Sequence, residues 1–544
     1  MTSAGQSEHP TTVKIRFVDV PANAGSRSPH VVVVTRPKGG SKALPSAVVS
    51  TGVTRRSSGC LPHLGWLPLP MVVLLAGCVT VGPDYVAPDP AAPTTWQAEP
   101  APGISETAGE PDDLARWWAT LDDPVLTRLI EQAVAGNLDL KQAQARLREA
   151  RARRKQTGAD RFPSLDANAL VNRVQSSEET GPGSTTTLYA AGFDASWELD
   201  VFGGTRRAME AATASEQASE EDLRDVLVSL LSEVALNYVE LRTGQTGLAI
   251  AEQNRDAQQE TYDIARWRFE AGLVTELDVE QARYNLEQTK AQIPRLQAAI
   301  SEAQNRLAVL LGRMPGALNS ELAPPLPIPV APASVAVGVP ADALRRRPDV
   351  RRAERRLAAQ TAQVGVATAA RYPSFSLVGT IGLESLSSSN LFTAGARTSS
   401  LGGSALWTVF DFGRLRENVN IQSALQEQAL LAYESAVRTA VEDTENALVA
   451  FAKEQNRRSH LQAATEAAQR AVALARGRYE SGLLDFQTVL EAQRSLLVLQ
   501  DQLALSDGAV VSNLIQLYKA LGGGWTSFGA AAGKPIGDST GAAQ

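Results

Sequence analysis

Asp485 follows a Gly-Leu-Leu triplet, and an acid near a glycine could be interpreted as a catalytic acid. The sequence around it offers no base or nucleophile to complete such a site. An acidic residue at the start of a helix more often caps that helix or interacts favourably with its dipole. We therefore expect Asp485, and with it Asp278 after an earlier Gly-Leu pair, to act through charge and position.

Other residue types that commonly do chemistry are too scattered to form a site. The two cysteines cannot form a disulfide framework, and the sequence lacks GxGxxG, Walker A, GxSxG and HExxH motifs. No metal cluster is expected from the four histidines, which lie far apart, at His9, His30, His63 and His460. These absences predict a protein that is not an enzyme and that holds no cofactor or metal.

Charge and composition narrow the class of function further. Residues 1–77 carry eight Lys or Arg and two Asp or Glu, so the remaining 44 basic and 57 acidic residues give residues 78–544 a net charge of −13. An acidic chain of this kind argues against nucleic-acid binding. The composition is rich in Ala, Gln and Arg and poor in aromatic residues, which favours long helices.

The start of the chain is typical of an export leader that is cleaved just before Cys78. Arg55 and Arg56 precede a short apolar stretch that finishes Leu-Ala-Gly-Cys, and this ending resembles a bacterial lipoprotein box. That resemblance implies a diacylglycerol thioether on Cys78, with a further acyl chain on its amine after cleavage. An ordinary signal followed by a chance cysteine is the alternative. Residue 79 is Val and not Asp, which by the same resemblance implies sorting to the outer membrane.

Two Gly-Leu turns reveal an internal repeat. The stretch RWRFEAGLVTELDVEQA begins at Arg266 and returns as RGRYESGLLDFQTVLEA at Arg476, 210 residues later. Each copy sets its Gly-Leu pair between two long helical patterns, where glycine supplies the backbone freedom that a helix end needs. Other matches hold the same offset, including Trp197 with Trp407. The chain is therefore predicted to contain two copies of one unit.

Each copy also contains two extended segments with alternating side chains. In the second segment of the first copy, apolar residues from Tyr189 to Val201 alternate with Asp194, Ser196 and Glu198. Strands of about ten residues, apolar on one face and polar on the other, suit a transmembrane barrel. A soluble two-faced sheet would show the same alternation. Four strands cannot close a barrel, so the barrel would be shared among a dimer, trimer or tetramer.

The helical patterns are unusually long. Residues 206–271 and 416–481 contain no proline and repeat apolar residues at spacings of three and four. Shorter helices are expected over 138–160 and 349–370, and returning helices over 275–311 and 485–521. The helices alone would also fit a structural coiled-coil protein, but the leader and the strand patterns favour an exported channel.

Three motifs carry a resemblance to a known family. They are VGPDY after Cys78, the WW and DDP block of residues 117–124, and RYESGLLDFQTVLEAQRSL in the second copy. On these, the chain resembles the outer-membrane efflux proteins of the TolC superfamily, in its lipoprotein branch with NodT- and OprM-type factors. The resemblance implies an α+β membrane protein: a homotrimer with a shared β-barrel of four strands per chain over a periplasmic barrel of coiled-coil helices.

The same resemblance assigns roles to the turns and implies partners. It places the adaptor-docking periplasmic tip at Gly272, Leu273, Val274, Gly482, Leu483 and Leu484, and an aperture at Asp485 and, less directly, Asp278. It implies a passive conduit across the outer membrane that exports drugs or other small molecules, served by a periplasmic adaptor and an inner-membrane pump of the resistance-nodulation-division (RND) type. The alternative is the same architecture serving an ABC-type (type I) secretion system.

The predicted domain organisation follows from these patterns. Residues 1–77 form the leader, of which 1–54 are attributed to a start site assigned too early. Residues 78–120 form a lipidated extended arm, and the tail is expected to be disordered because it is rich in Gly and Ala. The first repeat is assigned to residues 121–313 and the second to residues 341–522. The proline-rich linker between them is residues 314–340, and the tail is residues 523–544.

Overall fold

The computed structural model describes residues 80–89, 93–98, 104–105, 114–332 and 335–528. All of them lie within one compact unit, Leu69–Gln544. Cys78, the predicted leader and residues 529–544 of the predicted tail lie outside the described residues.

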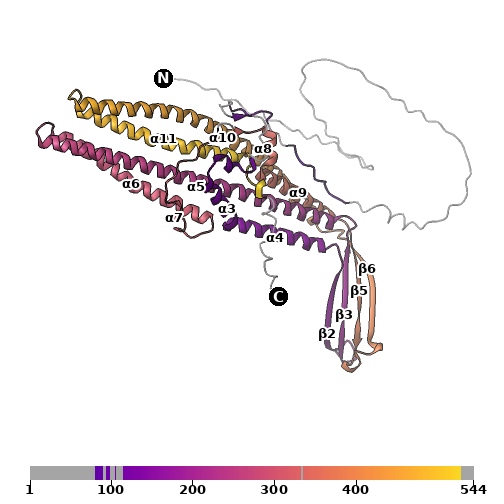
Figure 1. Ribbon diagram of the computed structural model, residues 1–544. Helices are drawn as coiled ribbons and strands as arrows, with labels where there is room; N and C mark the ends of the chain where they lie inside the picture. Colours follow the sequence, from indigo (N-terminus) through magenta and orange to yellow (C-terminus); the bar gives the residue numbers. More distant parts are fainter. Residues whose placement is uncertain (1–79, 90–92, 99–103, 106–113, 333–334, 529–544) are drawn as a thin grey trace, which may run out of the picture. The chain divides into compact units, whose positions relative to one another are not determined.

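Six helices dominate the described part of the chain, and they occur as two equivalent sets (Figure 1). Each set has a helix of 22 residues, one of 67 and one of 35. The first set is α4, Leu138–Ala159; α5, Gly204–Glu270; and α6, Glu276–Leu310. The second is α9, Pro348–Ala369; α10, Arg414–Glu480; and α11, Phe486–Ala520. Every bound in the second set lies 210 residues after its counterpart, which confirms the predicted repeat.

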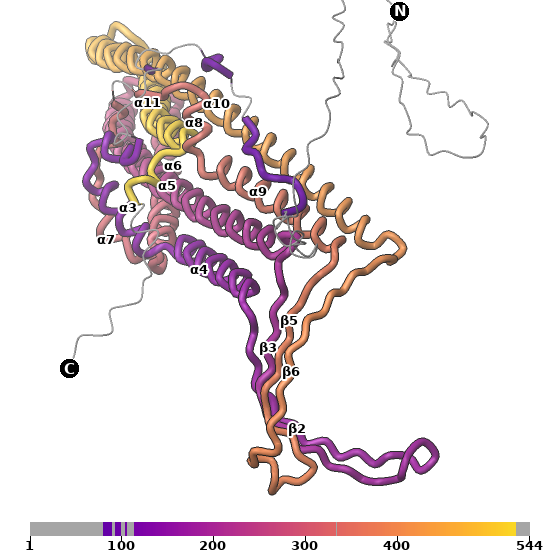
Figure 2. The backbone as a smooth tube through the Cα atoms, turned by 90° about the vertical axis from the view of Figure 1, so that its right-hand side faces the viewer, coloured from indigo at the N-terminus to yellow at the C-terminus, as the bar shows by residue number. Residues whose placement is uncertain are grey.

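The four long strands form one antiparallel sheet that continues from the ends of the helices (Figure 2). Its order is β2-β3-β5-β6, so the two hairpins of the repeat lie next to each other through β3 and β5. The strands are β2, Ser164–Gln175; β3, Thr185–Leu199; β5, Ser374–Ser385; and β6, Arg397–Leu406. The outer edges of β2 and β6 have no strand partner among the described residues.

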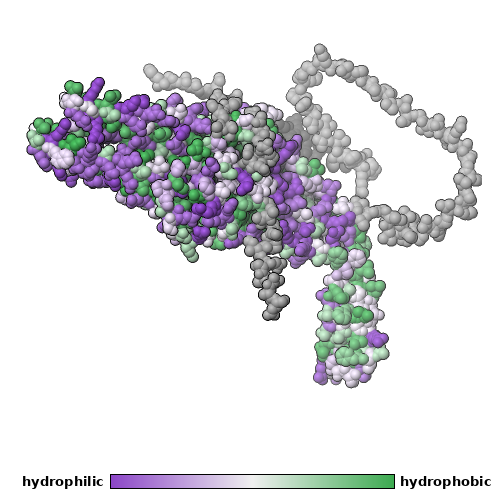
Figure 3. Space-filling model, in the orientation of Figure 1, coloured by the Kyte–Doolittle hydropathy of each residue, from purple (hydrophilic) through white to green (hydrophobic). Residues whose placement is uncertain are grey.

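The sheet register keeps the predicted faces apart. Across β2 and β3, Ala167 pairs with Phe193 and Asp166 pairs with Asp194, so apolar residues meet apolar ones and acidic residues meet each other. Apolar and weakly polar residues cover the strands, whereas the helices present a largely hydrophilic surface (Figure 3). Within the described residues, none of the helices is both long and apolar enough to cross a membrane.

The main core lies midway along α5 and α10, where α6 and α11 end. Trp117 and Trp118 are almost fully buried there, and Trp117 stacks on Tyr518 with ring centroids 5.5 Å apart. Short elements pack around them: η1, Trp117–Leu121; α3, Pro124–Gly136; α7, Asn319–Leu322; α8, Pro340–Arg346; and the paired strands β1, Ile104–Ser105, and β4, Val335–Ala336. Each fully buried leucine of α3 contributes about 1.5–3 kcal/mol.

The arm after Cys78 is fixed to the helices rather than free. The Arg207 side chain is buried, donates to the carbonyl oxygens of Val81 and Gly82 at 3.2 and 3.3 Å, and pairs with Asp84 at 2.6 Å. Further along, the Trp96 indole N–H donates to the Gly338 carbonyl at 2.8 Å. The arm is thereby tied to the first repeat near the strands and to the linker between the repeats near the core.

The first part of the predicted disordered tail is ordered. Phe528 stacks on Trp118 with ring centroids 5.6 Å apart, and the Gly524 N–H donates to the Leu114 carbonyl at 3.0 Å. Composition alone misses this, because a few aromatic residues in a glycine-rich segment can bind a preformed apolar surface. Residues 523–528 therefore belong to the core.

Candidate functional site at the helical turns

The first predicted turn closes α5 through Gly272. Its φ of +69° is the left-handed conformation that glycine adopts without strain. The Gly272 N–H donates to the Phe269 carbonyl and the Leu273 N–H to the Arg268 carbonyl, both at 2.8 Å. These two bonds form a Schellman motif, which satisfies the last carbonyls of the helix. A Cβ on Gly272 would meet nothing within 4 Å, so φ alone requires glycine here.

The second turn repeats this arrangement at the end of α10. Gly482 has a φ of +73°, its N–H donates to the Tyr479 carbonyl at 3.0 Å, and the Leu483 N–H donates to the Arg478 carbonyl at 2.9 Å. The two turns are thus equivalent in hydrogen bonding as well as in sequence. Both lie at the end of the long helices away from the strands (Figure 1).

Each turn presents one leucine outward. Leu273 and Leu483 are 72% and 77% exposed, whereas Val274 and Leu484 are half-buried. An exposed leucine at a helix turn gains nothing for the fold in the single chain. These positions are accessible for contact with another protein.

Both predicted aperture residues take part in capping a helix. Asp485 is itself the N-cap, whereas Asp278 lies three residues after the N-cap. Asp485 is the N-cap of α11, and its carboxylate accepts from the backbone N–H and the hydroxyl of Thr488, at 2.7 and 2.8 Å. In the first copy the N-cap is Thr275, and the acid stands three residues later as Asp278. The Asp278 carboxylate accepts from the Thr275 backbone N–H and hydroxyl, at 2.9 and 2.8 Å.

This exchange means that each turn carries one fixed carboxylate. The hydrogen bond from the Thr488 backbone N–H, followed by the one from its hydroxyl, holds the pKa of Asp485 below its ordinary value. The Asp485 carboxylate is fully exposed, and Asp278 is half-buried. Both carboxylates are held in place by hydrogen bonds at the same end of the helices.

An apolar cluster joins the two hairpins just behind the turns. It draws on both copies and consists of Ala265, Val279, Ala282, Phe486 and Leu490, with Tyr262 and Tyr479 packed against it. The Arg268 guanidinium lies 4.4 Å from the centre of the Tyr479 ring, which adds a cation–π contact between the hairpins. The sequence analysis missed this cluster, since Phe486 has a polar counterpart, Glu276, in the first copy.

Polar side chains complete the contact between the hairpins. Arg476 pairs with Glu260 at 2.8 Å, and the Arg494 guanidinium donates to the Asn285 side chain at 2.9 Å. The Arg476–Glu260 pair is about half exposed, so it orients the hairpins more than it stabilises them. The two turns thus belong to one assembled end of the molecule.

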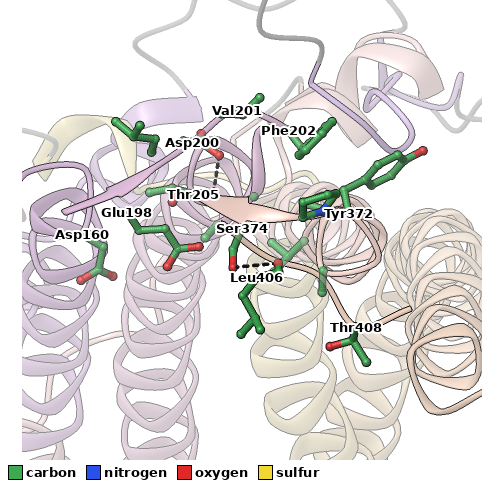
Figure 4. A pocket seen from close by; sticks show the side chains of 17 residues that line it. Asp160, Glu198, Asp200, Val201, Phe202, Thr205, Tyr372, Ser374, Leu406 and Thr408 are labelled. Atoms are coloured by element: carbon green, nitrogen blue, oxygen red, sulfur yellow. Dashed lines mark hydrogen bonds between the residues drawn. The ribbon is translucent and has the colours of Figure 1, made fainter. Parts of the chain in front are cut away.

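A second polar feature lies where the strands meet the helices. A hollow of about 420 Å³ is lined by Asp160, Glu198, Asp200, Ser374 and Thr408, among others (Figure 4). Asp200 is engaged in structure, because its carboxylate accepts from the backbone N–H groups of Thr205 and Arg206 at the start of α5. Within the described residues, no group of His, Cys, Asp and Glu could hold a metal ion.

Comparisons with known proteins agree with this arrangement. The family model described as outer membrane efflux protein matches residues 129–313 and 339–523, one match for each copy of the repeat. The chain is 32% identical over 470 residues to a solvent efflux pump outer membrane protein, SrpC, of Pseudomonas putida, with 85% of this chain and 98% of that protein covered.

A curated lipoprotein and a solved channel are similar over the same length. The chain is 30% identical over 478 residues to the probable outer membrane lipoprotein SilC of Salmonella typhimurium, covering 84% of this chain and 98% of that one. The structure of the outer-membrane channel OprN matches with a TM-score of 0.78 and 38% identity, covering 82% of this chain and 99% of the channel. The agreement extends over both sets of helices and the sheet, and not over one element alone.

Proposed function

The chain belongs to the outer membrane efflux protein family and is the outer-membrane channel of an efflux pump, and from that premise we propose that three copies of it build one conduit. It is not an enzyme. The observation that carries the proposal is the sheet of four strands, whose two outer edges have no strand partner in the part of the chain that the structure describes. Lipid does not tolerate open strand edges, and three copies supply 12 strands for one closed barrel. The long helices of each copy continue below it.

The proposed conduit is built from two repeats per chain. We assign them to residues 121–313 and 341–522, joined by the linker 314–340, and we assign the end of the helices that carries the two turns to the periplasm. Three copies would bring six turns around one axis. The chain contains no nucleotide-binding loop, so the free energy for export must come from a partner in the inner membrane.

We assign adaptor docking to the turns. Leu273 and Leu483 are exposed beside fixed glycines and are supported from behind by the apolar cluster of both hairpins. A rigid surface with a few exposed apolar side chains suits the tip of a periplasmic adaptor. The proposed partners are that adaptor and a pump of the resistance-nodulation-division (RND) type, which selects what enters the conduit.

We assign the aperture to Asp485 and Asp278. Two carboxylates per chain are held at the turns by hydrogen bonds, which would give six carboxylates around the axis of a trimer. Rings of carboxylates favour cations over anions at a constriction.

We also propose that Cys78 carries the lipid anchor. Thr80, two residues later, lies against Gly203 at the foot of β3, where a Cβ on Gly203 would come within 2.7 Å of the Thr80 side chain. The described part of the chain therefore begins close to the strands assigned to the membrane. The relative SilC is itself named a probable lipoprotein. Acyl chains on Cys78 would add about 0.8 kcal/mol for each buried methylene.

The proposed substrates are small organic molecules. The relative SrpC is named for solvent efflux, and the polar face of the strands carries hydroxyl and carboxylate side chains, which suit a water-filled passage. A conduit of this kind transmits whatever the pump delivers. A type I secretion system would require the same chain to work with an ABC transporter.

The test is complementation in a Gram-negative strain that lacks its own outer-membrane efflux channel. Expressed with an RND pump and adaptor, the chain is expected to fractionate with the outer membrane and to restore resistance to solvents and antibiotics. A Cys78→Ser variant is expected to lose the mobility shift that globomycin causes in the wild-type chain. Recovery in the soluble fraction, or restored protein secretion without restored resistance, would exclude the proposed function.

A further inference from the structure

A hollow lies between α5, α6 and α11, and we propose that it binds amphiphilic organic cations, which are molecules with an apolar body and a positive charge. Its volume of about 530 Å³ is within the range of pockets that hold small molecules. Apolar side chains of the hollow contact the body of the molecule, and the carboxylates of Glu240 and Asp501 attract its charge. This site goes beyond the proposed conduit and does not depend on it.

The hollow exists because two helices pack closely on α5 without closing on each other. α6 approaches α5 at Gly244, where an added Cβ would lie 3.2 Å from the Ile300 side chain. α11 approaches α5 at its own Gly508, where a Cβ would clash with the side chain of Thr243. α6 and α11 contact each other at only a few positions, so a gap with α5 as its floor remains between them.

The hollow opens on the side of α5 away from the short elements of the core. Residues that line it recur on α5 at spacings of four and three and so share one face of the helix: Leu236, Glu240, Thr243 and Gly247. Tyr238 and Arg242 lie on the opposite face. There the Tyr238 hydroxyl donates to the Asp123 carboxylate at 2.7 Å, and the Arg242 guanidinium donates to the Pro324 carbonyl at 2.9 Å. The start of α3 and the linker are therefore on the other side of α5 and do not cover the hollow.

The two side walls of the hollow are mainly apolar. Leu296 and Ala299 of α6 form one wall, and Ala504 and Leu505 of α11 belong to the other. Leu505 is 54% exposed, so a good part of its apolar surface is in contact with water. An apolar body placed between these walls removes that surface from water, which favours binding.

The charge of the hollow selects the class of molecule. Its lining contains two carboxylates and no basic side chain. Within the described residues, neither Glu240 nor Asp501 is engaged in an ion pair or a side-chain hydrogen bond. Asp501 is half-buried, and a Cβ on Gly247 would lie 3.9 Å from its carboxylate. A carboxylate in partly apolar surroundings attracts a cation more strongly than one in bulk water does.

The equivalent face of α10 is unsuited to such a molecule. The positions that correspond to Gly244 and Gly247 are Glu454 and Arg457, whose long side chains occupy the space that the glycines leave open. Arg457 also adds a positive charge that repels a cation. The proposed site is therefore specific to the first copy of the repeat, with one site in each chain.

Titration of ethidium, a planar apolar cation, tests the site by fluorescence anisotropy with the purified full chain in lipid nanodiscs. We expect saturable binding that weakens as NaCl is added. Asp501→Asn is expected to raise the Kd about tenfold, since it removes one charge. Ala299→Phe is expected to abolish saturable binding, because its ring fills the hollow. The matched controls are Glu302→Gln and Ala298→Phe, at exposed positions of α6 outside the lining, and both should bind ethidium as the wild type does.

A neutral apolar probe separates charge from shape. N-phenyl-1-naphthylamine should bind the wild type and Asp501→Asn equally. The same ethidium affinity in the wild type and Ala299→Phe would overturn the site, and the same affinity in the wild type and Asp501→Asn would overturn the choice of a cation. A wild-type chain without saturable binding would overturn the proposal as well, and would mean that another occupant, such as a neighbouring copy, fills the hollow. Restored resistance in that case would leave the proposed function standing, since resistance does not require this site.

Discussion

The Asp485 carboxylate accepts two hydrogen bonds from Thr488, one from the backbone N–H at 2.7 Å and one from the hydroxyl at 2.8 Å. In the first copy the same pair of residue types is present with its order reversed, as Thr275 and Asp278. Both copies of the repeat therefore contain a capping pair of one Thr and one Asp, but the Asp occupies a different position in each copy. A carboxylate that caps a helix is fixed in space, which is also what a charged constriction requires.

Replacing Asp485 by Asn separates these two roles. Asparagine is as good an N-cap as aspartate but carries no charge. We expect Asp485→Asn to lower the cation selectivity of single channels and to weaken their block by divalent cations. The free energy of unfolding should be unchanged. Asp485→Ala should show the same loss of selectivity and should also loosen the start of α11. Unchanged selectivity and block in both variants would exclude Asp485 from the aperture.

The pH dependence of selectivity follows from the lowered pKa of Asp485. A carboxyl whose folded pKa lies below its ordinary value of 3.8 stays charged well into the acid range, and the capping contribution is lost only as pH falls through that lower value. We expect cation selectivity in planar bilayers to be constant from about pH 8 to about pH 5 and to fall only below about pH 4. A midpoint near pH 6 would show that repulsion between neighbouring carboxylates outweighs the two hydrogen bonds.

The need for glycine at the second turn can be tested by replacing Gly482, with Gly477 in the preceding helix as the matched control. Gly482 and Gly477 both have open space where a Cβ would be added, but only Gly482 has a positive φ. We expect Gly482→Ala to destabilise the turn by about 1–2 kcal/mol, since the left-handed conformation is strained for alanine. Gly477→Ala should stabilise α10 by up to about 1 kcal/mol. Hydrogen exchange of the amides around the turn measures both, and equal protection in the two variants would contradict this account.

Local sequence patterns predicted the helices and turns because their causes are local. Pro163 and Pro373 end the short helices, and Gly272 and Gly482 end the long ones, through restrictions on one or two residues. The contacts between hairpins were not predictable in this way. Whether Arg268 meets Tyr479 depends on which faces of two distant helices pack together, and the repeat itself is uneven there. The ordered structure of residues 523–528 was not predictable either, because it depends on a core assembled from distant segments.

Arg207 is expected to control whether the arm stays attached. Its side chain is almost fully buried and binds the arm through the carbonyl groups of Val81 and Gly82 and the carboxylate of Asp84. Arg207→Gln removes the charge and most of these bonds to acceptors that are exposed or half-buried, at a cost of about 1–3 kcal/mol to the docked arm. Asp84→Asn is the control, because the Asp84 side chain is 86% exposed and its loss should cost well under about 1 kcal/mol. Limited proteolysis between residues 80 and 89 reads the outcome: we expect rapid cleavage in Arg207→Gln and wild-type resistance in Asp84→Asn. Equal resistance in both would mean that Trp96 and the rest of the arm hold it without Arg207.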